Sequence, residues 1–177
     1  MSAKDIRNIV LLGHSGSGKT TLAESMLYLT GGTDRLGRIA DGNTVCDYDP
    51  EEIRRQISIS LAVAPVEYDS CKINVLDVPG GFDFAGEVAE AVQAADAAVI
   101  VCSAKAGMSV GAERRGNIAR RTLSPVCSTS PRPTRRTPTT TPRSTRCASA
   151  SARTSAPVVR PHLGREQEGH RHHRRAA

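Results

Sequence analysis

Eight consecutive residues near the N-terminus have the types and the spacing of a phosphate-binding loop. Gly13–Thr20 reads GHSGSGKT and matches G-x-x-x-x-G-K-[ST]. Glycines let backbone N–H groups approach phosphate oxygens closely, and a following helix directs the positive end of its dipole at the same anion. We expect Lys19 to carry the charge that meets the β- and γ-phosphates and the Thr20 hydroxyl to ligate Mg²⁺. The alternative, a glycine-rich turn that only caps a helix, is disfavoured because every fixed position matches.

A second motif of the same chemistry is Asp77-Val78-Pro79-Gly80, which follows an apolar run. In P-loop proteins an acidic residue at this place holds Mg²⁺ through water, and the glycine N–H contacts the γ-phosphate. Such a turn ends many strands, so the motif gains weight only from the loop that precedes it. The residues predicted to contact nucleotide phosphates are Gly13, His14, Ser15, Gly16, Ser17, Gly18, Lys19, Thr20, Thr21 and Gly80, with His14 as a spacer of the loop.

Apolar periodicity predicts the elements that must position these motifs. Strands are expected at 6–12, 57–66, 72–78 and 97–102, and helices at 20–29 and 85–95. Residues 31–56 are polar and aperiodic, which predicts a long functional loop. Strands alternating with helices indicate an α/β fold of the P-loop NTPase class, an incomplete one here, with a mostly parallel sheet and helices on both faces.

Charge and composition divide the chain near residue 113. Residues 1–113 carry a net charge of −7 and residues 114–177 one of +13, so the overall +6 averages two unlike parts. All five aromatic residues lie in the first part, and seven of the ten prolines lie in the second. A segment so poor in apolar residues cannot offset its conformational entropy by burial. We therefore expect a partial nucleotide-binding domain over 1–115 and a disordered tail, rich in Arg, Pro, Ser and Thr, over 116–177.

Cysteine spacing and hydropathy indicate the compartment. The five cysteines have neither paired nor metal-site spacing, which is typical of reduced thiols. The N-terminus lacks the blocks of a signal peptide, and no apolar run approaches the roughly 18 residues that span a membrane. A cytoplasmic protein without membrane contact is expected.

Residues 6–113 resemble the start of the GTPase domain of elongation factor G and its paralogues. The resemblance is carried by GHSGSGKTTL, EEIRRQISIS and VLDVPGGFDFAGEVAEAVQAADAAVIVCSA. It implies GTP and GDP as ligands, Mg²⁺ as cofactor, the ribosome as partner, and GTP hydrolysis coupled to translocation. In that family the long loop ends in Arg-Gly-Ile-Thr, whose threonine reaches Mg²⁺. The matching hydroxyl here belongs to Ser58, with Gln56 in place of the glycine; an ordinary strand serine is the alternative.

One departure from the family pattern bears on catalysis. The family's Asp-x-Pro-Gly is usually followed by a histidine that positions the attacking water, and here Gly81 stands at that place. Glycine has no side chain to orient water, and positioning with charge stabilisation supplies nearly all the catalysis of phosphoryl transfer. The sequence predicts nucleotide binding with weak or absent hydrolysis, and no catalytic residue is assigned. Some family members also lack the histidine, so a slow or ribosome-stimulated GTPase stays open.

The basic second part lacks the family's guanine-reading motif, Asn-Lys-x-Asp, so low selectivity for GTP over ATP is expected. One interpretation is an arginine-rich arm that binds RNA without selectivity. The favoured one is a frame-shifted translation that begins near 113–116. The codons that could encode this part can be read one base earlier. That frame permits three features in the order in which the family has them: Trp-Lys-Tyr, then Asn-Lys after an apolar residue, then an acidic run. The edge of the strand at 97–102 would then be uncovered and prone to aggregation.

Two other function classes remain as alternatives. One is a nucleic-acid-binding protein that acts through the arginine-rich tail, with a steep salt dependence. The other is a non-translational P-loop kinase or ATPase. The long loop before Ser58 and the Asp-x-Pro-Gly turn after an apolar strand argue against the second.

Overall fold

A mixed sheet forms the centre of the chain. The structure, a computed structural model, describes residues 5–103, 107–123 and 126–129. The strands of this part are β1 (Ile6–Leu12), β2 (Ala62–Tyr68), β3 (Cys71–Asp77), β4 (Ala97–Val101) and β5 (Val126–Thr129), in the order β2-β3-β1-β4-β5. All neighbours pair in parallel except β2, which runs antiparallel to β3. The predicted α/β class is confirmed.

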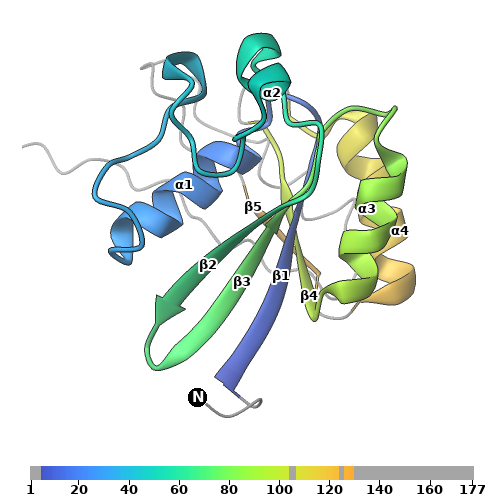
Figure 1. Cartoon of the computed structure of the whole chain (residues 1–177). Coiled ribbons are helices and arrows are strands. Elements are labelled where there is room, and N and C mark those ends of the chain that lie inside the picture. The colour runs from blue at the N-terminus through green and yellow to red at the C-terminus, as the bar shows by residue number, and fades with distance from the viewer. Residues whose placement is uncertain (1–4, 104–106, 124–125, 130–177) are drawn as a thin grey trace, which may run out of the picture.

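Helices cover both faces of this sheet (Figure 1). Helix α1 (Lys19–Leu29) lies on one face, and α3 (Ala85–Ala94) and α4 (Val110–Thr122) lie together on the other. The short helix α2 (Pro50–Arg55) and the 3-10 turn η2 (Ile39–Asp41) stand beyond the end of the sheet at which β1 and β3 finish. Of the helices described, none is long and apolar enough to cross a membrane.

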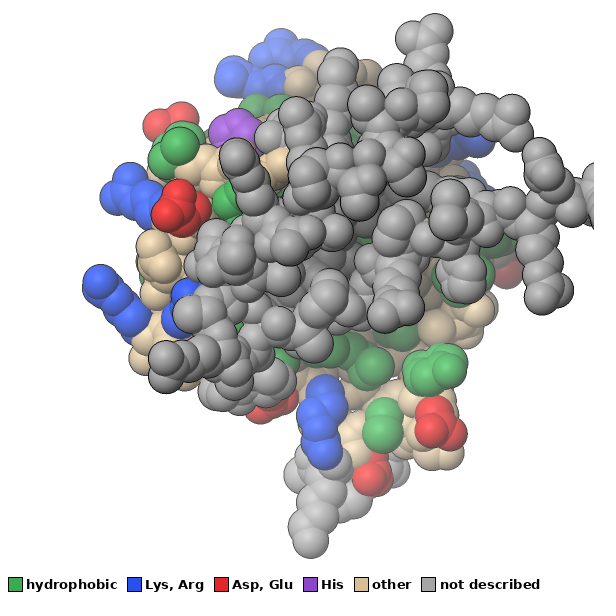
Figure 2. Space-filling model, turned by 180° about the vertical axis from the view of Figure 1, so that it is seen from behind, with side chains coloured by type: hydrophobic (Ala, Val, Ile, Leu, Met, Phe, Trp, Pro, Cys, Tyr) green, Lys and Arg blue, Asp and Glu red, His purple; other side chains and the backbone are tan. Residues whose placement is uncertain are grey.

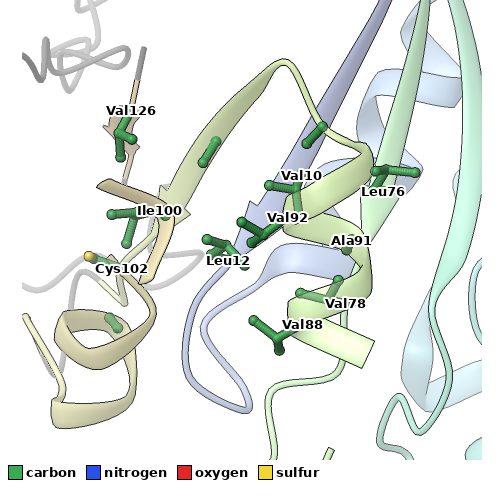
Figure 3. Close-up of a cluster of buried hydrophobic side chains, with 14 residues drawn as sticks. Val10, Leu12, Leu76, Val78, Val88, Ala91, Val92, Ile100, Cys102 and Val126 are labelled. Carbon is green, nitrogen blue, oxygen red and sulfur yellow. The ribbon is translucent and has the colours of Figure 1, made fainter. Parts of the chain in front are cut away.

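Two apolar clusters join the helices to the sheet. The cluster beneath α3 and α4 contains Val10 and Leu12 of β1 together with Val92 of α3 (Figure 3). The cluster beneath α1 contains Leu11 of β1 and Leu27 of α1. Successive strand residues point to opposite faces, so β1 alternates between the two clusters. Burial of each such side chain contributes about 1.5–3 kcal/mol, which makes β1 the element that fixes both layers.

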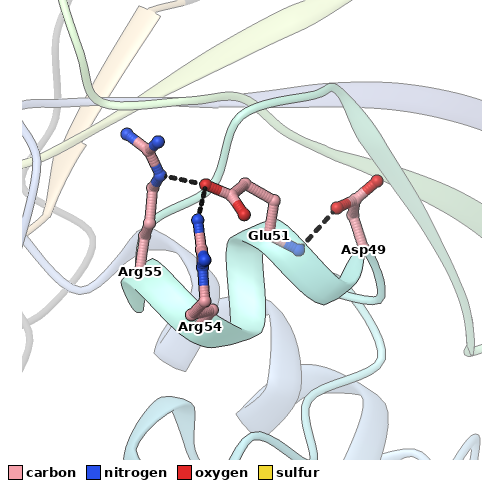
Figure 4. A network of polar contacts seen from close by, with 4 residues as sticks. All are labelled: Asp49, Glu51, Arg54 and Arg55. Carbon is pink, nitrogen blue, oxygen red and sulfur yellow. Dashed lines mark hydrogen bonds and ion pairs between the residues drawn. The ribbon is translucent and has the colours of Figure 1, made fainter.

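Helix α2 lies inside the segment 31–56 that was expected to be a loop. Asp49 caps it by accepting from the Glu51 N–H at 2.7 Å, and the Glu52 carboxylate accepts from the Asp49 N–H at 3.2 Å. Pro50 occupies the first helical turn, where its missing N–H costs nothing. Glu51 also accepts from Arg54 at 2.8 Å and from Arg55 (Figure 4). These local contacts stabilise a helix too short to show apolar periodicity.

The fold also continues beyond residue 115, where the domain was expected to end. Helix α4 runs to Thr122, and β5 pairs with β4 so that Val126 lies opposite Ala98. Ala112, Ala119 and Val126 are buried in the cluster beneath α3 and α4. The composition of the whole basic part conceals this short segment, whose small residues recur at helical spacing. The edge of β4 is therefore paired rather than uncovered; the remainder of the expected tail, from residue 130, lies outside the described residues.

Candidate phosphate and cation site

The Gly13–Thr20 loop connects β1 to α1 at the end of the sheet. Gly18, directly before α1, has a φ of 94°, a left-handed conformation that only glycine adopts without strain. A Cβ at Gly13 would lie 2.4 Å from the Val101 carbonyl oxygen, so the loop packs against β4. No side chain caps the first turn of α1. Its free N–H groups and the helix dipole are therefore available to an anion.

Lys19 is buried within this loop. Its ammonium donates to the carbonyl oxygens of His14 at 3.2 Å and Gly13 at 3.4 Å. Burial lowers the pKa of Lys19 to about 8, although the nearby Asp77 carboxylate opposes that shift. A phosphate anion bound in the loop would restore the charged form, since an opposite charge at short range favours it.

Four oxygen-bearing side chains meet at the start of α1. The Thr20 hydroxyl donates to Asp77 Oδ2 at 2.6 Å, and its oxygen lies 3.3 Å from Ser58 Oγ. The Ser58 hydroxyl donates to Asp47 Oδ1 at 2.7 Å. The second oxygens, Asp77 Oδ1 and Asp47 Oδ2, are buried and have no hydrogen-bond partner among the described residues. Burial raises the pKa of both carboxyls, that of Asp77 to about 6.

This set of donors fits a hard divalent cation such as Mg²⁺. Hydroxyl and carboxylate oxygens are the ligands that Mg²⁺ prefers, and buried oxygens without partners are costly unless a cation or water reaches them. Across the described ranges, no three His, Cys, Asp or Glu side chains are grouped as a metal site. A cation here would depend on hydroxyls, on water and on the oxygens of a bound phosphate, as Mg²⁺ in nucleotide sites commonly does.

Gly80 brings the Asp-x-Pro-Gly turn against the phosphate-binding loop. A Cβ at this position would lie 2.5 Å from the backbone nitrogen of Ser15, so only glycine permits the approach. A pocket lies between the two segments. It is lined by Ser15, Lys19, Thr20, Asp47, Ser58 and Gly80.

The remaining predicted residues lie at or behind this pocket. Gly16 and Gly18 line it, whereas His14 and Thr21 are exposed beside it. Ser17 is buried, and within the described part of the chain its Oγ has no hydrogen-bond partner. A Cβ at Gly81 would meet only the Phe84 ring, at 3.0 and 3.2 Å.

Two buried glutamates that sequence reasoning missed hold the long segment around the site. Glu24 of α1 accepts from the backbone N–H of Val45 at 2.7 Å and of Cys46 at 3.1 Å. Glu52 of α2 accepts from Ile59 at 2.8 Å and from the next residue, Ser60, at 3.0 Å. These bonds fix the residues next to Asp47 and Ser58, respectively. Glu52 could have been found from its capping-box spacing to Asp49, whereas Glu24 and Asp47 carry no local signal.

Comparisons with known proteins find similarity to GTP-binding domains over the first two thirds of the chain. The profile described as the elongation factor Tu GTP binding domain matches residues 4–128. The elongation factor G-like protein of Mycobacterium tuberculosis strain H37Rv is 48% identical over 103 residues, which cover 58% of this chain and 14% of that protein. Elongation factor G 2 of Streptomyces coelicolor is 43% identical over 108 residues, 61% of this chain and 16% of the relative. The chain thus spans a small part of the curated relatives that it matches.

Solved structures show the same fold. A crystal structure of a Thermus thermophilus protein, 44% identical, superposes with a TM-score of 0.66 over 70% of this chain and 19% of that one. A bacterial selenocysteine-specific elongation factor, 21% identical, superposes with a TM-score of 0.57 over 70% of this chain and 19% of its own and shares the fold.

Proposed function

The chain belongs to the family of elongation factor Tu GTP-binding domains, and from that premise we propose that it binds the phosphates of GTP and GDP together with Mg²⁺. The backbone of Gly13–Thr20 would surround the phosphates, Lys19 would meet the β- and γ-phosphates, and the Gly80 N–H would contact the γ-phosphate. The observation that carries the proposal is the meeting of Lys19, Thr20, Asp77 and Gly80 at the uncapped start of α1.

In this proposal Thr20 and Ser58 would hold Mg²⁺ through their hydroxyls and Asp77 would hold it through water. The partnerless Asp77 Oδ1 and the 3.3 Å separation of the two hydroxyl oxygens support that assignment. Bound Mg²⁺ neutralises charge on the β- and γ-phosphate oxygens. The Asp47 carboxylate, which accepts from Ser58, keeps that hydroxyl close to Thr20.

Hydrolysis is proposed to be weak, because Gly81 offers no side chain to orient water. We base three further proposals on the family alone: the ribosome as partner, translocation as the process and the cytoplasm as the compartment. Selectivity for guanine is proposed to be low, because the 177 residues contain no Asn-Lys-x-Asp. The frame-shift hypothesis stays a prediction, and the nucleotide sequence across codons 113–117 decides it.

The arginine-rich tail as an RNA-binding arm has less support. Residues 130–177, which would form most of it, lie outside the described part of the chain. On the face that Figure 2 shows, the Lys and Arg side chains of described residues lie at separate places among acidic and apolar ones.

Titration of the purified 177-residue chain with fluorescent GDP, GTP and ATP analogues tests the proposal. We expect binding that depends on Mg²⁺, with similar affinities for GTP and ATP. Lys19→Ala should weaken binding at least about ten-fold, because it removes a charge-assisted contact to phosphate. Lys72→Ala, on β3, is the matched control and should bind as the unmodified chain does. Equal affinities of the two variants, or tight GTP-selective binding, would contradict the proposal.

A further inference from the structure

Arg115 is a buried cation that the phosphate site, as described so far, leaves without a role. It lies on α4 with 5% of its surface exposed. In the part of the chain that the structure describes, its guanidinium forms no ion pair with a carboxylate. It donates instead to three backbone carbonyls, those of Gly13 at 2.9 Å, Gly80 at 2.9 Å and Gly81 at 2.7 Å.

These three carbonyls belong to the two segments whose relative position defines the pocket. Gly13 is the first residue of the phosphate-binding loop, and Gly80 and Gly81 form the turn after β3. One planar guanidinium therefore bridges two segments that are far apart in the sequence, and Arg115 itself lies 102 positions after Gly13. A lysine has one nitrogen and no such fork, so it could not span both in the same way.

An aromatic ring and the phosphate-binding loop lie next to the guanidinium. The Phe82 ring lies with its centroid 5.7 Å from the guanidinium carbon, and the His14 ring centroid lies 6.0 Å from that of Phe82. A Cβ at Gly111 would lie 2.8 Å from His14 Nδ1, so α4 packs directly on the phosphate-binding loop. The Phe82 ring thus lies beside the guanidinium, and α4 packs on the loop whose Gly13 carbonyl accepts from it.

The charge balance around Arg115 favours an anion in the pocket. Carbonyl oxygens accept hydrogen bonds from its two terminal nitrogens but do not neutralise its charge, and a buried unpaired charge is costly. The positive charge of Arg115 also acts on Lys19, whose charged form is already disfavoured by burial. A polyphosphate bound beside both residues would relieve this repulsion, and it would do so more fully the more negative charge it carries.

We propose that Arg115 is a positioning residue that holds the Gly80 turn against the phosphate-binding loop, so that the site binds a nucleoside triphosphate more tightly than the diphosphate. The proposal rests on the proposed function, because it assumes that the pocket binds nucleotide phosphates. It adds a group from α4 to a site otherwise built from β1, α1, β3 and the segment 31–60.

The test compares the unmodified 177-residue chain with Arg115→Gln, Arg115→Lys and, as matched control, Arg114→Gln. Arg114 is exposed on the same helix, so its replacement removes the same charge without breaking the bridge. Two quantities are measured: the ratio of Kd values for fluorescent GDP and a non-hydrolysable GTP analogue, and hydrogen exchange of the amides at 80–82 in the nucleotide-free protein. Circular dichroism monitors folding.

We expect Arg115→Gln to lower the preference for the triphosphate about ten-fold, the loss that follows from removing a charged hydrogen-bond donor. In the same variant the affinity for GDP should stay within about two-fold, and hydrogen exchange at 80–82 should accelerate. Arg115→Lys should give intermediate values of both quantities, and Arg114→Gln should change neither. An unchanged ratio, or an equal loss of both ligands, would overturn the positioning role. If the unmodified chain binds neither nucleotide, the proposed function fails. Hydrogen exchange at 80–82 then still tests whether Arg115 holds the turn against the phosphate-binding loop. Equal exchange rates in Arg115→Gln and the unmodified chain would refute that role.

Discussion

Asp77 and Asp47 face the same small volume beside Thr20, and each has one buried oxygen that no described residue reaches with a hydrogen bond. Burial raises the pKa of each carboxyl, and the neighbouring carboxylate adds to the shift of Asp77. In the metal-free protein these side chains therefore destabilise the fold at neutral pH. A bound cation would remove that cost. The two carboxylates that destabilise the metal-free domain would therefore stabilise the metal-bound one.

Asp77 predicts a pH dependence of stability with a definite sign. Its pKa is about 6 in the folded chain and about 3.9 in an unfolded one, so the unfolded state releases its proton first. Between about pH 4 and pH 6 the contribution of Asp77 to the free energy of unfolding should fall as pH rises, by about 3 kcal/mol in all. Asp77→Asn should abolish this fall.

Urea denaturation in EDTA at pH 4 and at pH 7 measures the effect. Asp69→Asn, in the exposed β2–β3 turn, is the control and should keep the pH dependence of the unmodified chain. If Asp77→Asn shows the same difference between the two pH values as this control, Asp77 does not carry the effect.

Gly81 predicts a gain of activity on substitution. Its Cβ position meets only the Phe84 ring, so a side chain can begin there after a small movement of that ring. If the family's water-positioning role applies here, Gly81→His should raise single-turnover GTP hydrolysis on the order of 10²-fold with nucleotide affinity unchanged. Gly81→Ala displaces the same ring without adding an imidazole and serves as control. Equal rates in the two variants would mean that another group limits hydrolysis.

At the scale of elements, the segment 31–60 decides how the site is assembled. It was expected to be a loop followed by a strand from residue 57, whereas β2 begins at Ala62. Glu52 accepts the N–H groups of Ile59 and Ser60, which are then withheld from a strand ladder. The bend keeps Ser58 near Thr20 instead of extending it along the sheet.

The same segment shows what the sequence can and cannot predict. The loop at Gly13–Thr20 was predictable because its residues are contiguous and each type has a local reason. Asp47 and Glu24 were not, because their roles depend on contacts across 11 and 22 residues, respectively, that no periodicity records. Arg115 was harder still to predict, because an arginine in a basic segment is expected to be exposed to solvent. Only the packing of α4 on the sheet shows that it is buried.

Glu52 offers a test of this assembly. Both of its carboxylate oxygens accept backbone N–H groups, and glutamine would turn an amide N–H₂ toward one of these donors. Glu52→Gln should lower the free energy of unfolding by about 1–3 kcal/mol and weaken Mg²⁺-dependent nucleotide binding, because Ser58 loses its support.

Glu51→Gln is the matched control for Glu52→Gln. Among the described residues, the Glu51 carboxylate pairs with Arg54 and Arg55 at the surface, where ion pairs add little, so both quantities should remain unchanged. Urea denaturation and nucleotide titration measure the two effects. Nucleotide binding retained in Glu52→Gln would show that Ser58 is held in place by other contacts.

For the whole molecule, the question is where the folding unit ends. The sheet gains β5 through parallel pairing with β4, and α4 supplies buried Ala112 and Ala119 as well as Arg115. The contrast between a net −7 over 1–113 and +13 thereafter places a boundary near residue 113. The packing of α4 and β5 indicates that the folding unit ends after residue 115. Charge is averaged over a whole segment, whereas burial differs from one residue to the next.

Truncation distinguishes the two boundaries. A chain ending at residue 129 should unfold within a few degrees of the full chain, because it keeps α4 and β5. A chain ending at 115 loses Val126, whose burial alone contributes about 1.5–3 kcal/mol, and each kcal/mol shifts the Tm of a domain of about 125 residues by about 4 °C. It also leaves β4 as an unpaired edge, so it should self-associate at micromolar concentration. Thermal denaturation and light scattering measure both effects, and equal stability and solubility of the two chains would return the boundary to residue 115.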